Sequence, residues 1–322
     1  MMIYIIIVNW NGIDDTLACL NSLLKLSYKD FSIVVCDNGS LDDSLEKLGE
    51  WHSSLGDIDK KKFIYERINV NEVGQYRKKD DSCGIYVVDI KKNLGFSGGN
   101  NVGINFALSQ GDMKYVWLLN NDTVVDKNSL SIMESAFDKN KNIGICGSRL
   151  VYFDDRDKIQ GLGGVFYPVF CMAKHYKAHE RSDMKFDDDI VSKNIDYIIG
   201  ASMLISKSVL DDIGGLCEEY FLYYEEIDFC LRAKKNGYQI FVATDSIVYH
   251  KEGASTKKES KGAVSDYYFV RNRLLVAKKF YPKWYLTVYL SIFIALINRV
   301  KRKEYKKARN VINVLLNKEM EI

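Results

Sequence analysis

The chain has 322 residues, 47% of them hydrophobic and 12% aromatic, which is enough to bury one large core or one core with a smaller appendage. Its seven cysteines are scattered without a C-x-x-C pair, which argues against a zinc or dithiol site and favours reduced thiols in a cytoplasmic protein. The net charge of +2 excludes no class of protein, but Lys and Arg crowd residues 271–307, where Glu304 is almost the only acid.

Short, unbroken apolar runs predict strands that are covered on both faces, as in a parallel sheet. They occupy residues 3–8, 32–36, 85–90, 115–119 and 143–147. The first run is too short for a signal sequence and has no basic flank. Helical patterns lie between the runs, at residues 16–26, 41–48, 100–108 and 129–137. This alternation predicts an α/β fold with a doubly wound, mostly parallel, Rossmann-like sheet.

Two segments depart from this alternation. Residues 50–84 are charged and contain one strand-like piece, residues 63–67, which predicts an insertion with a hairpin. Residues 152–190 are irregular, and a long irregular stretch inside a compact domain favours a functional flap. The pattern is wholly helical from Asp266, so we predict a first domain of residues 1–265 and a helical, basic C-terminal extension of residues 266–322.

Polar residues follow three of the predicted strands, where ligands bind in an open parallel sheet. They are Asn9 and Asn11 after the first strand, Asp37 after the second, and the run Asn120, Asn121 and Asp122. Each group alone fits ordinary turn chemistry. Together they predict one ligand-binding crevice.

A glycine-rich segment, NLGFSGGNNVGI, places Gly95, Gly98 and Gly99 before a helix that we expect to open near Asn100. Such a loop would let backbone N–H groups approach a phosphate or a sugar. Its spacing is neither G-x-G-x-x-G nor that of a P-loop, which disfavours nicotinamide-dependent and ATP-hydrolysing enzymes.

Two adjacent acids, Glu225 and Glu226, lie in the first turn of a predicted helix that closes at Asn236-Gly237. A position near a helix N-terminus favours acids without any catalytic role. Asp228 and Arg232 are spaced i, i+4, so we expect them to pair on the helix and assign Asp228 no catalysis.

Six stretches together resemble glycosyltransferase family 2, specifically its rhamnosyltransferase-like branch. They are IIIVNWNG, VVCDNGSLDDS, NLGFSGGNNVGI, WLLNNDTVV, GASMLISKSVLDDIGGLCEEYFLYYEEIDFCLRAKKNGY and VYHKEGAS. The matches follow the family order across residues 1–255, apart from the predicted insertion and flap. The resemblance implies the GT-A type of α/β fold. It also implies transfer of a sugar, L-rhamnose from dTDP-rhamnose, onto a saccharide acceptor, one carried on a lipid, in bacterial surface polysaccharide synthesis.

The resemblance also implies roles for the donor-binding residues. Asp37 matches the aspartate that accepts the N3–H of uracil or thymine, and a carboxylate is an acceptor of the right kind. Asn93 and Asn100, with Gly95 and Gly98 between them, match the segment that lines the donor pocket. Asn9, Asn11, Asn120 and Asn121 are assigned to the same pocket.

A metal site is implied at Asp122, which matches the last position of the family's D-x-D motif and would hold Mn²⁺ or Mg²⁺ against the diphosphate. Asn120 replaces the first Asp of that motif. His250 matches a histidine near the metal, and an imidazole ligand favours Mn²⁺ over Mg²⁺.

The implied general base is Glu226, which stands where the family has Asp, with Glu225 beside it. Either carboxylate type can accept a proton from a sugar hydroxyl, but Glu is one methylene longer. The reaction implied is a single in-line displacement that inverts the anomeric carbon.

Other interpretations stay open. The donor could be a UDP-sugar, such as UDP-galactofuranose, UDP-N-acetylglucosamine or UDP-glucose. The chain could instead be a nucleotide-sugar-binding subunit without turnover, because Asn120 and Glu226 both depart from the expected acids. A sugar-nucleotide pyrophosphorylase is disfavoured, since its glycine-rich N-terminal signature is missing. Nothing in the sequence indicates nucleic acid.

The C-terminal extension contains an apolar segment, residues 284–297, that falls short of the roughly 20 residues needed to cross a bilayer. It predicts a helix lying on the inner face of the cell membrane, with the basic residues 299–307 on anionic lipid. The alternative is an ordinary helical lid that covers the sheet.

Overall fold

The computed structural model describes residues 1–78, 83–251, 259–316 and 318. Its strands are β1 (Met2–Asn9), β2 (Phe31–Asp37), β3 (Phe63–Asn69), β4 (Cys83–Asp89), β5 (Met113–Leu119), β6 (Thr123–Val125), β7 (Ile143–Tyr152), β8 (Ile159–Gly161), β9 (Gly164–Tyr167), β10 (Met172–His175), β11 (Ser202–Ser206) and β12 (Gln239–His250). Its α-helices are α1 (Ile13–Leu23), α2 (Ser44–Ser54), α3 (Asp57–Lys62), α4 (Gly95–Ser109), α5 (Ser129–Lys139), α6 (Asp188–Lys193), α7 (Lys207–Ile213), α8 (Glu225–Lys235), α9 (Glu259–Phe280), α10 (Tyr285–Lys301) and α11 (Tyr305–Leu315). Short 3-10 helices are η1 (Val70–Glu72), η2 (Glu218–Tyr220) and η3 (Pro282–Trp284).

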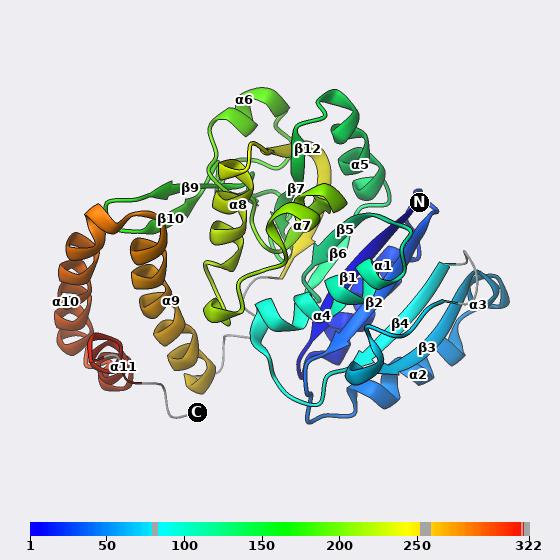
Figure 1. The fold of residues 1–322 in the computed structure, drawn as a ribbon, viewed down its shortest axis with the longest axis horizontal. Coiled ribbons are helices and arrows are strands. Elements are labelled where there is room, and N and C mark those ends of the chain that lie inside the picture. Colours follow the sequence, from blue (N-terminus) through cyan, green and yellow to red (C-terminus); the bar gives the residue numbers. More distant parts are fainter. Residues whose placement is uncertain (79–82, 252–258, 317, 319–322) are drawn as a thin grey trace.

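Within the described residues, ten strands form one sheet in the order β3-β4-β2-β1-β5-β11-β7-β12-β6, with β8 paired to β7 (Figure 1). The run from β3 to β5 is parallel, while β11 and β6 are antiparallel to their neighbours. This is the predicted doubly wound, mostly parallel α/β sheet, and the prediction is confirmed.

The central strands are buried on both faces, as their continuous apolar sequence predicts. In β1, Ile3, Ile5 and Ile7 on one face and Tyr4 and Ile6 on the other are all fully buried. A sheet with helices on both sides removes every one of these side chains from water. All five predicted strands are present, each within a few residues of its expected bounds.

The hairpin predicted within residues 50–84 is wrong. Residues 63–69 instead form β3, which pairs in parallel with β4 from Phe63 opposite Cys83 to Asn69 opposite Asp89. A parallel neighbour needs a longer connection than a hairpin turn, and η1 lies within it. Its position at the sheet edge also explains why Ile64 is 39% exposed.

The segment predicted as an irregular flap contains regular elements. β8 joins the main sheet, β9 and β10 form a two-stranded antiparallel hairpin, and α6 follows. All seven cysteines lie in the described ranges and are unpaired, as predicted.

The C-terminal helices α9, α10 and α11 stand together at the opposite end of the molecule from β3 and β4 (Figure 1). Val276, Val288, Ile292 and Val311 are fully buried among the three helices. Because α10 packs mainly on α9, α11 and η3, the alternative of a lid covering the sheet is wrong. The described part of α9 starts at Glu259, so the predicted domain boundary between residues 265 and 266 falls inside a helix. No helix in the described part of the chain has both the length and the hydropathy to cross a membrane.

Gly103 tests the close packing of α4 on β1. A Cβ at this position would lie 2.5 Å from Cγ2 of the buried Ile6, so Gly103→Ala should lower the free energy of unfolding by about 1–3 kcal/mol through overpacking. Gly49→Ala is the control, because Gly49 lies in α2 with only the Tyr65 hydroxyl near its Cβ, and it should gain about 0.5–1 kcal/mol from helix propensity. Urea unfolding of both variants measures the difference, and equal shifts would contradict this packing.

Candidate active site

Asp122 and His250 meet where the loop after β5 reaches the end of β12. His250 Nε2 lies 3.2 Å from Asp122 Oδ1, and the backbone N–H of Lys251 donates to the Asp122 carbonyl at 3.0 Å. Burial alone would raise the pKa of Asp122, but the hydrogen bond and charge of His250 outweigh burial and leave this pKa below its usual value. Asp122 therefore stays ionised at neutral pH although it is buried.

Asn120 supplies a third polar group beside this pair. Its backbone N–H donates to the Ala201 carbonyl at 3.0 Å, and its Nδ2 lies 3.4 Å from His250 Nε2. Its Oδ1 is buried and has no hydrogen-bond partner among the residues that the structure describes. A buried acceptor without a donor is costly, and a cation would satisfy it.

These groups suit a divalent cation whose remaining ligands come from a molecule bound at the site. In the described residues no three His, Cys, Asp or Glu side chains converge, so the protein offers two such groups and one amide oxygen. Oxygen ligands suit Mg²⁺ and Mn²⁺, the imidazole favours Mn²⁺, and phosphate oxygens can complete the shell.

A hydrogen-bonded network connects the ends of β1 and β2. Asn9 Nδ2 donates to Asp37 Oδ2 at 2.8 Å and to Ser40 Oγ at 3.1 Å, and Thr16 donates to Asn9 Oδ1 at 2.8 Å. Asp37 Oδ1 accepts the Ser40 N–H at 3.0 Å. Asp37 is thus fixed at the predicted crevice, and its role in binding the base stays a prediction.

Asn11 and Asn121 hold the neighbouring loops together. Asn11, at φ +51°, accepts the Leu41 N–H on its Oδ1 at 2.7 Å. Asn121 Nδ2 donates to Thr16 Oγ1 at 3.1 Å and to the Gly12 carbonyl at 3.3 Å. Both amides are engaged within the protein, so the structure gives them a role in holding the loops after β1, β2 and β5 together.

The glycine-rich segment differs from its prediction, because α4 begins at Gly95 and not near Asn100. Gly95 has φ +72°, and a Cβ there would lie 2.4 Å from the Phe221 carbonyl, which accepts the Phe96 N–H. Gly98 allows close packing in the same way, since a Cβ there would lie 2.6 Å from Leu94 Cβ. These glycines permit close approach within the protein, which was missed because sequence does not show which backbone contacts a glycine.

The amides of this segment are also engaged. Asn93 Oδ1 accepts from Asn38 Nδ2 at 3.0 Å and from the Gly95 N–H at 2.8 Å. Buried Asn100 donates to the Phe96 carbonyl one turn earlier in α4. The N–H groups of Gly95 and Phe96 therefore already have protein acceptors.

Glu225 and Glu226 follow a loop with an unusual backbone. Phe221, Tyr223 and Tyr224 have φ values of +57°, +67° and +74°, a region that non-glycine residues rarely adopt. Such conformations persist only where surrounding contacts enforce them, and they cluster at functional sites.

Glu226 is partly exposed as a residue, but its Oε2 is buried without a partner among the described residues. Burial raises the pKa of Glu226 to about 7, although backbone groups of Glu226, Ile227 and Tyr224 oppose the rise. Burial and the neighbouring Glu226 raise the pKa of Glu225 well above its usual value.

Glu226 lies next to Gly200, since a Cβ added to Gly200 would be 3.5 Å from the Cβ of Glu226. The carbonyl of the next residue, Ala201, accepts the backbone N–H of Asn120. The fold therefore brings Glu226 to the side of the Asn120 corner.

Asn272 of α9 holds this loop in place. It is fully buried, and its Nδ2 donates to the carbonyls of Tyr220, Leu222 and Tyr223 at 2.8–2.9 Å. The Tyr224 hydroxyl adds a bond to the Cys171 carbonyl at 2.9 Å.

Asp228 is structural, as predicted from its spacing. It is fully buried, Arg232 Nε donates to its Oδ1 at 2.6 Å, and Lys279 of α9 pairs with its Oδ2. Both oxygens are thus occupied by cations.

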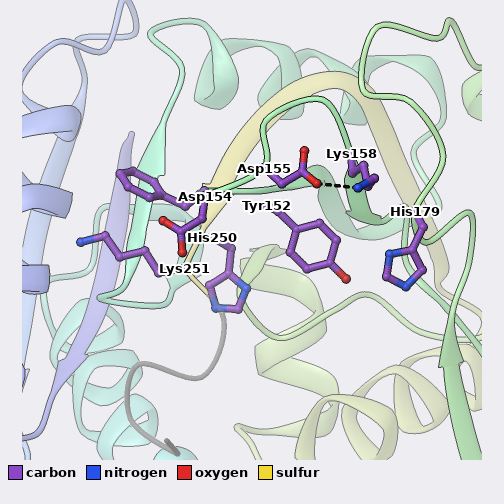
Figure 2. A pocket seen from close by; sticks show the side chains of 8 residues that line it. Tyr152, Asp154, Asp155, Lys158, His179, His250 and Lys251 are labelled. Carbon is purple, nitrogen blue, oxygen red and sulfur yellow. Dashed lines mark hydrogen bonds and ion pairs between the residues drawn. The ribbon is translucent and has the colours of Figure 1, made fainter.

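His250 also forms one wall of a hollow of about 280 Å³ (Figure 2). The other walls come from the end of β7, the turn after it, and the segment after β10. Its lining residues are Tyr152, Phe153, Asp154, Asp155, Lys158, His179, His250 and Lys251. The rings of Tyr152 and His179 stack at 5.7 Å, and Lys158 pairs with Asp155 at 2.6 Å. The site is therefore open beside His250.

No motif or residue spacing in the sequence identifies some of the residues at the site. Gln160, which bonds His250 Nδ1 at 2.8 Å, lies in the irregular middle segment, and Asn272 lies in the predicted helical, basic C-terminal extension. Asp89 had a signal, because it ends a predicted strand beside Asp37, and it binds Arg67 and Lys91 there. The last family-like stretch, VYHKEGAS, runs past Lys251 into residues 252–255, which lie outside the described residues.

Comparison with known families settles the class of the protein. Residues 77–266 match the family described as "Glycosyltransferase like family 2", and residues 4–78 match "Glycosyl transferase family 2". The chain belongs to glycosyltransferase family 2. It is 27% identical over 259 residues to the low-salt glycan biosynthesis hexosyltransferase Agl10 of Haloferax volcanii, covering 79% of this chain and 77% of Agl10. It is 24% identical over 215 residues to the dTDP-rhamnosyl transferase RfbF of Shigella flexneri, covering 65% and 68%.

Solved structures show the same fold. S. aureus TarS residues 1–349 in complex with UDP-GlcNAc has a TM-score of 0.56 at 16% identity, covering 98% of this chain and 82% of that one. The mannosyltransferase PcManGT from Pyrobaculum calidifontis, in complex with GDP-Man and Mn²⁺, has a TM-score of 0.55 at 10% identity, covering 98% and 86%. The match to the longer TarS chain spans 39% of its length. The fold of this family 2 enzyme is therefore of the GT-A type.

Asn272→Ala tests whether α9 holds the loop before Glu225. Three carbonyls, one buried and two part-buried, would lose the NH2 group that they share, so the free energy of unfolding should fall by about 2–3 kcal/mol. Asn236→Ala is the control, since Asn236 is exposed and donates to the Arg232 carbonyl, and it should change stability by less than about 1 kcal/mol. Urea unfolding of both variants measures this, and similar small losses would show that the loop does not depend on Asn272.

Proposed function

We propose that this glycosyltransferase moves L-rhamnose from dTDP-rhamnose onto a saccharide acceptor carried on a lipid, with inversion of the anomeric carbon. The observation that carries the proposal is that two buried oxygens, Asn120 Oδ1 and Glu226 Oε2, have no partner among the described residues and belong to side chains next to the Gly200–Ala201 segment. No described residue satisfies either oxygen, and a cation with a diphosphate would satisfy the first while a sugar hydroxyl would satisfy the second.

Two observations bear on the choice of donor nucleotide. The relative RfbF is a dTDP-rhamnosyl transferase by name, and Agl10 is a hexosyltransferase. Asp37 is an acceptor for the N3–H that thymine and uracil share, so it serves either nucleotide. The alternative is a UDP-sugar such as UDP-GlcNAc, which the TarS structure contains.

Asn120, Asp122 and His250 would hold the cation, Mn²⁺ or Mg²⁺, and PcManGT was solved with Mn²⁺. When bound, such an ion neutralises the charge that develops on the departing diphosphate. His250 gives Mn²⁺ the advantage.

Glu226 is the general base of the proposed reaction. Its carboxylate takes the proton of the acceptor hydroxyl while that oxygen bonds to the anomeric carbon. The bond from this carbon to the β-phosphate oxygen breaks, and its electron pair leaves with the nucleoside diphosphate. A pKa of about 7 suits a base that must gain and lose a proton at neutral pH.

Glu226→Gln tests the reaction itself. A positioned base contributes about 10²–10⁴-fold, so kcat should fall by that factor while donor binding persists. Glu219→Gln is the control, because Glu219 is exposed in the same loop region and should leave kcat unchanged. Release of dTDP or UDP is measured with Mn²⁺ across dTDP-rhamnose, UDP-galactofuranose, UDP-GlcNAc and UDP-glucose. Donor binding without release by the unmodified enzyme would favour the subunit without turnover.

The raised pKa of Glu226 also predicts how kcat/KM depends on pH. Because burial raises the pKa of Glu226 to about 7, the ionised base is lost below that pH, and kcat/KM should fall about tenfold per pH unit on the acid side and level off above it. A profile flat from pH 5 to 8 would contradict this assignment of the base.

We also propose that α10 lies on the anionic inner face of the cell membrane. Its inner side is fully buried at Val288 and Ile292, while Leu286, Leu290 and Ile297 on the outer side are 54–66% exposed. A helix that presents an apolar stripe to solvent marks an interaction surface. The stripe ends in Lys301, Arg302 and Lys303, which suits anionic lipid and a lipid-carried acceptor.

Point substitutions on α10 test this surface and leave the contacts of α9 with the loop before Glu225 in place. Leu290→Asp combined with Ile297→Asp should weaken sedimentation with vesicles of anionic phospholipid at least about tenfold, since both side chains lose their burial in lipid. Ile190→Asp is the control, because Ile190 is 60% exposed on α6, away from this face. Equal binding by all three proteins would show that α10 is not the membrane surface.

A further inference from the structure

A second hollow, of about 280 Å³, lies where α9, the end of α10 and the start of α11 meet (Figure 1). Charged side chains line it: Asp266 from α9, Arg299 from α10, Arg302 and Glu304 from the turn, and Lys307 from α11. None of the residues that line this charged hollow belongs to the candidate active site, so the proposed reaction does not account for it.

The positive charges of the hollow outnumber the negative ones. Arg299 donates to both carboxylate oxygens of Asp266, at 3.2 and 2.5 Å, and Lys307 pairs with Glu304 at 3.0 Å. The Lys307 bond and the three nearby positive charges hold the pKa of Glu304 below its usual value. Arg302 is exposed and makes no ion pair with a described residue, so one cation is left over.

This surplus charge suits a phosphate group. A guanidinium matches phosphate oxygens with parallel N–H bonds and gives up water more readily than an ammonium does. Arg299 is held by Asp266 with its side chain only 17% exposed, so its orientation is set before any ligand arrives. Asn298 also lines the hollow and adds an amide donor.

The exposed apolar stripe of α10 leads into the hollow. Leu290, Ile294 and Asn298 are spaced i, i+4, so they follow one another on one face of the helix. Leu290 and Ile294 are 55% and 62% exposed, and Asn298 lines the hollow. A phosphate held there would lie beside a surface that suits acyl chains, which favours the phosphate of a lipid over a free phosphate ion.

A basic helix end does not by itself require a ligand, because cations are favourable at a helix C-terminus. Lys301 is exposed at the same end of α10, but it does not line the hollow. A diffuse attraction to an anionic surface would use Lys301 and Arg302 equally, whereas a defined site would use Arg302 far more. The two residues therefore separate these explanations.

We propose that the charged hollow binds the phosphate group of an anionic membrane lipid, with Arg302 and Arg299 as its contacts. The inference rests on the membrane attachment proposed for α10, and it adds a defined headgroup site to that surface.

The test compares Arg302→Gln with Lys301→Gln in the full chain, because each removes one charge from an exposed position. Isothermal titration calorimetry at one ionic strength measures binding of dihexanoyl phosphatidic acid, kept below its micelle concentration, and of inorganic phosphate. Sedimentation with phosphatidylcholine vesicles that contain phosphatidic acid measures membrane attachment separately. Urea unfolding verifies that both variants keep the stability of the unmodified protein.

We expect the Kd for dihexanoyl phosphatidic acid to rise about 10–100-fold in Arg302→Gln, since charged hydrogen bonds to the phosphate are lost. Lys301→Gln should raise it by no more than about fivefold, the effect of one charge near an anionic group. Inorganic phosphate should bind the unmodified protein at least about tenfold more weakly than the lipid, because it gains nothing from the apolar stripe.

Equal rises in the two variants would overturn the inference, and so would absence of binding of the soluble lipid to the unmodified protein. Inorganic phosphate that binds as tightly as the lipid would also overturn it, since free phosphate would then be the ligand. Binding of the soluble lipid without sedimentation on vesicles would instead overturn the proposed membrane surface and support the headgroup site, so the two failures are distinct.

Discussion

The contact between Asp122 and His250 is the interaction on which the candidate site depends. It joins the loop after β5 to the last residue of β12, two segments far apart in sequence. The sheet brings them together, because β6 pairs antiparallel with β12 and places His250 opposite Thr123. Both side chains are buried, so separating them would deprive the buried Asp122 carboxylate of its contact with His250. The geometry of this corner is therefore a consequence of strand pairing.

The surroundings shift the pKa values of the two acids Asp122 and Glu226 in opposite directions. Asp122 stays ionised because His250 outweighs the effect of burial, whereas no described cation offsets the burial of Glu226, and its pKa rises to about 7. One carboxylate thus suits the proposed role of a metal ligand, and the other suits the proposed role of a base. Different environments can push the pKa values of two carboxylates apart, so that one stays ionised while the other exchanges a proton. The Glu that replaces Asp at position 226 fits this division, since burial controls its pKa.

The sheet could be predicted from sequence because its strands are apolar on both faces, and no other arrangement of such runs hides them so completely. The pairing of β3 could not be predicted, because one strand-like piece does not show whether its partner follows a tight turn or a longer connection. The extent of α4 was missed because Gly95 serves a contact with Phe221, which is distant in sequence.

At the site, resemblance predicted Asp122, His250 and Glu226, and the structure places Asp122 beside His250 and Glu226 beside the Asn120 segment. Their roles stay predictions. Gln160 and Asn272 could not be found from sequence, because each acts through one long-range hydrogen bond pattern that no spacing encodes.

The C-terminal helices are part of the catalytic unit in a physical sense. Asn272 binds three carbonyls of the loop before Glu225, Lys279 pairs with buried Asp228, and Arg273 donates to the Phe170 carbonyl. A chain cut at residue 266 would leave Asp228 without one of its cations and the positive-φ loop without its donor. Buried contacts of α9 therefore join the described parts of the two predicted domains. Since α9 carries these contacts on one side and packs against α10 on the other, the proposed membrane surface and the proposed base lie on the two sides of one helix.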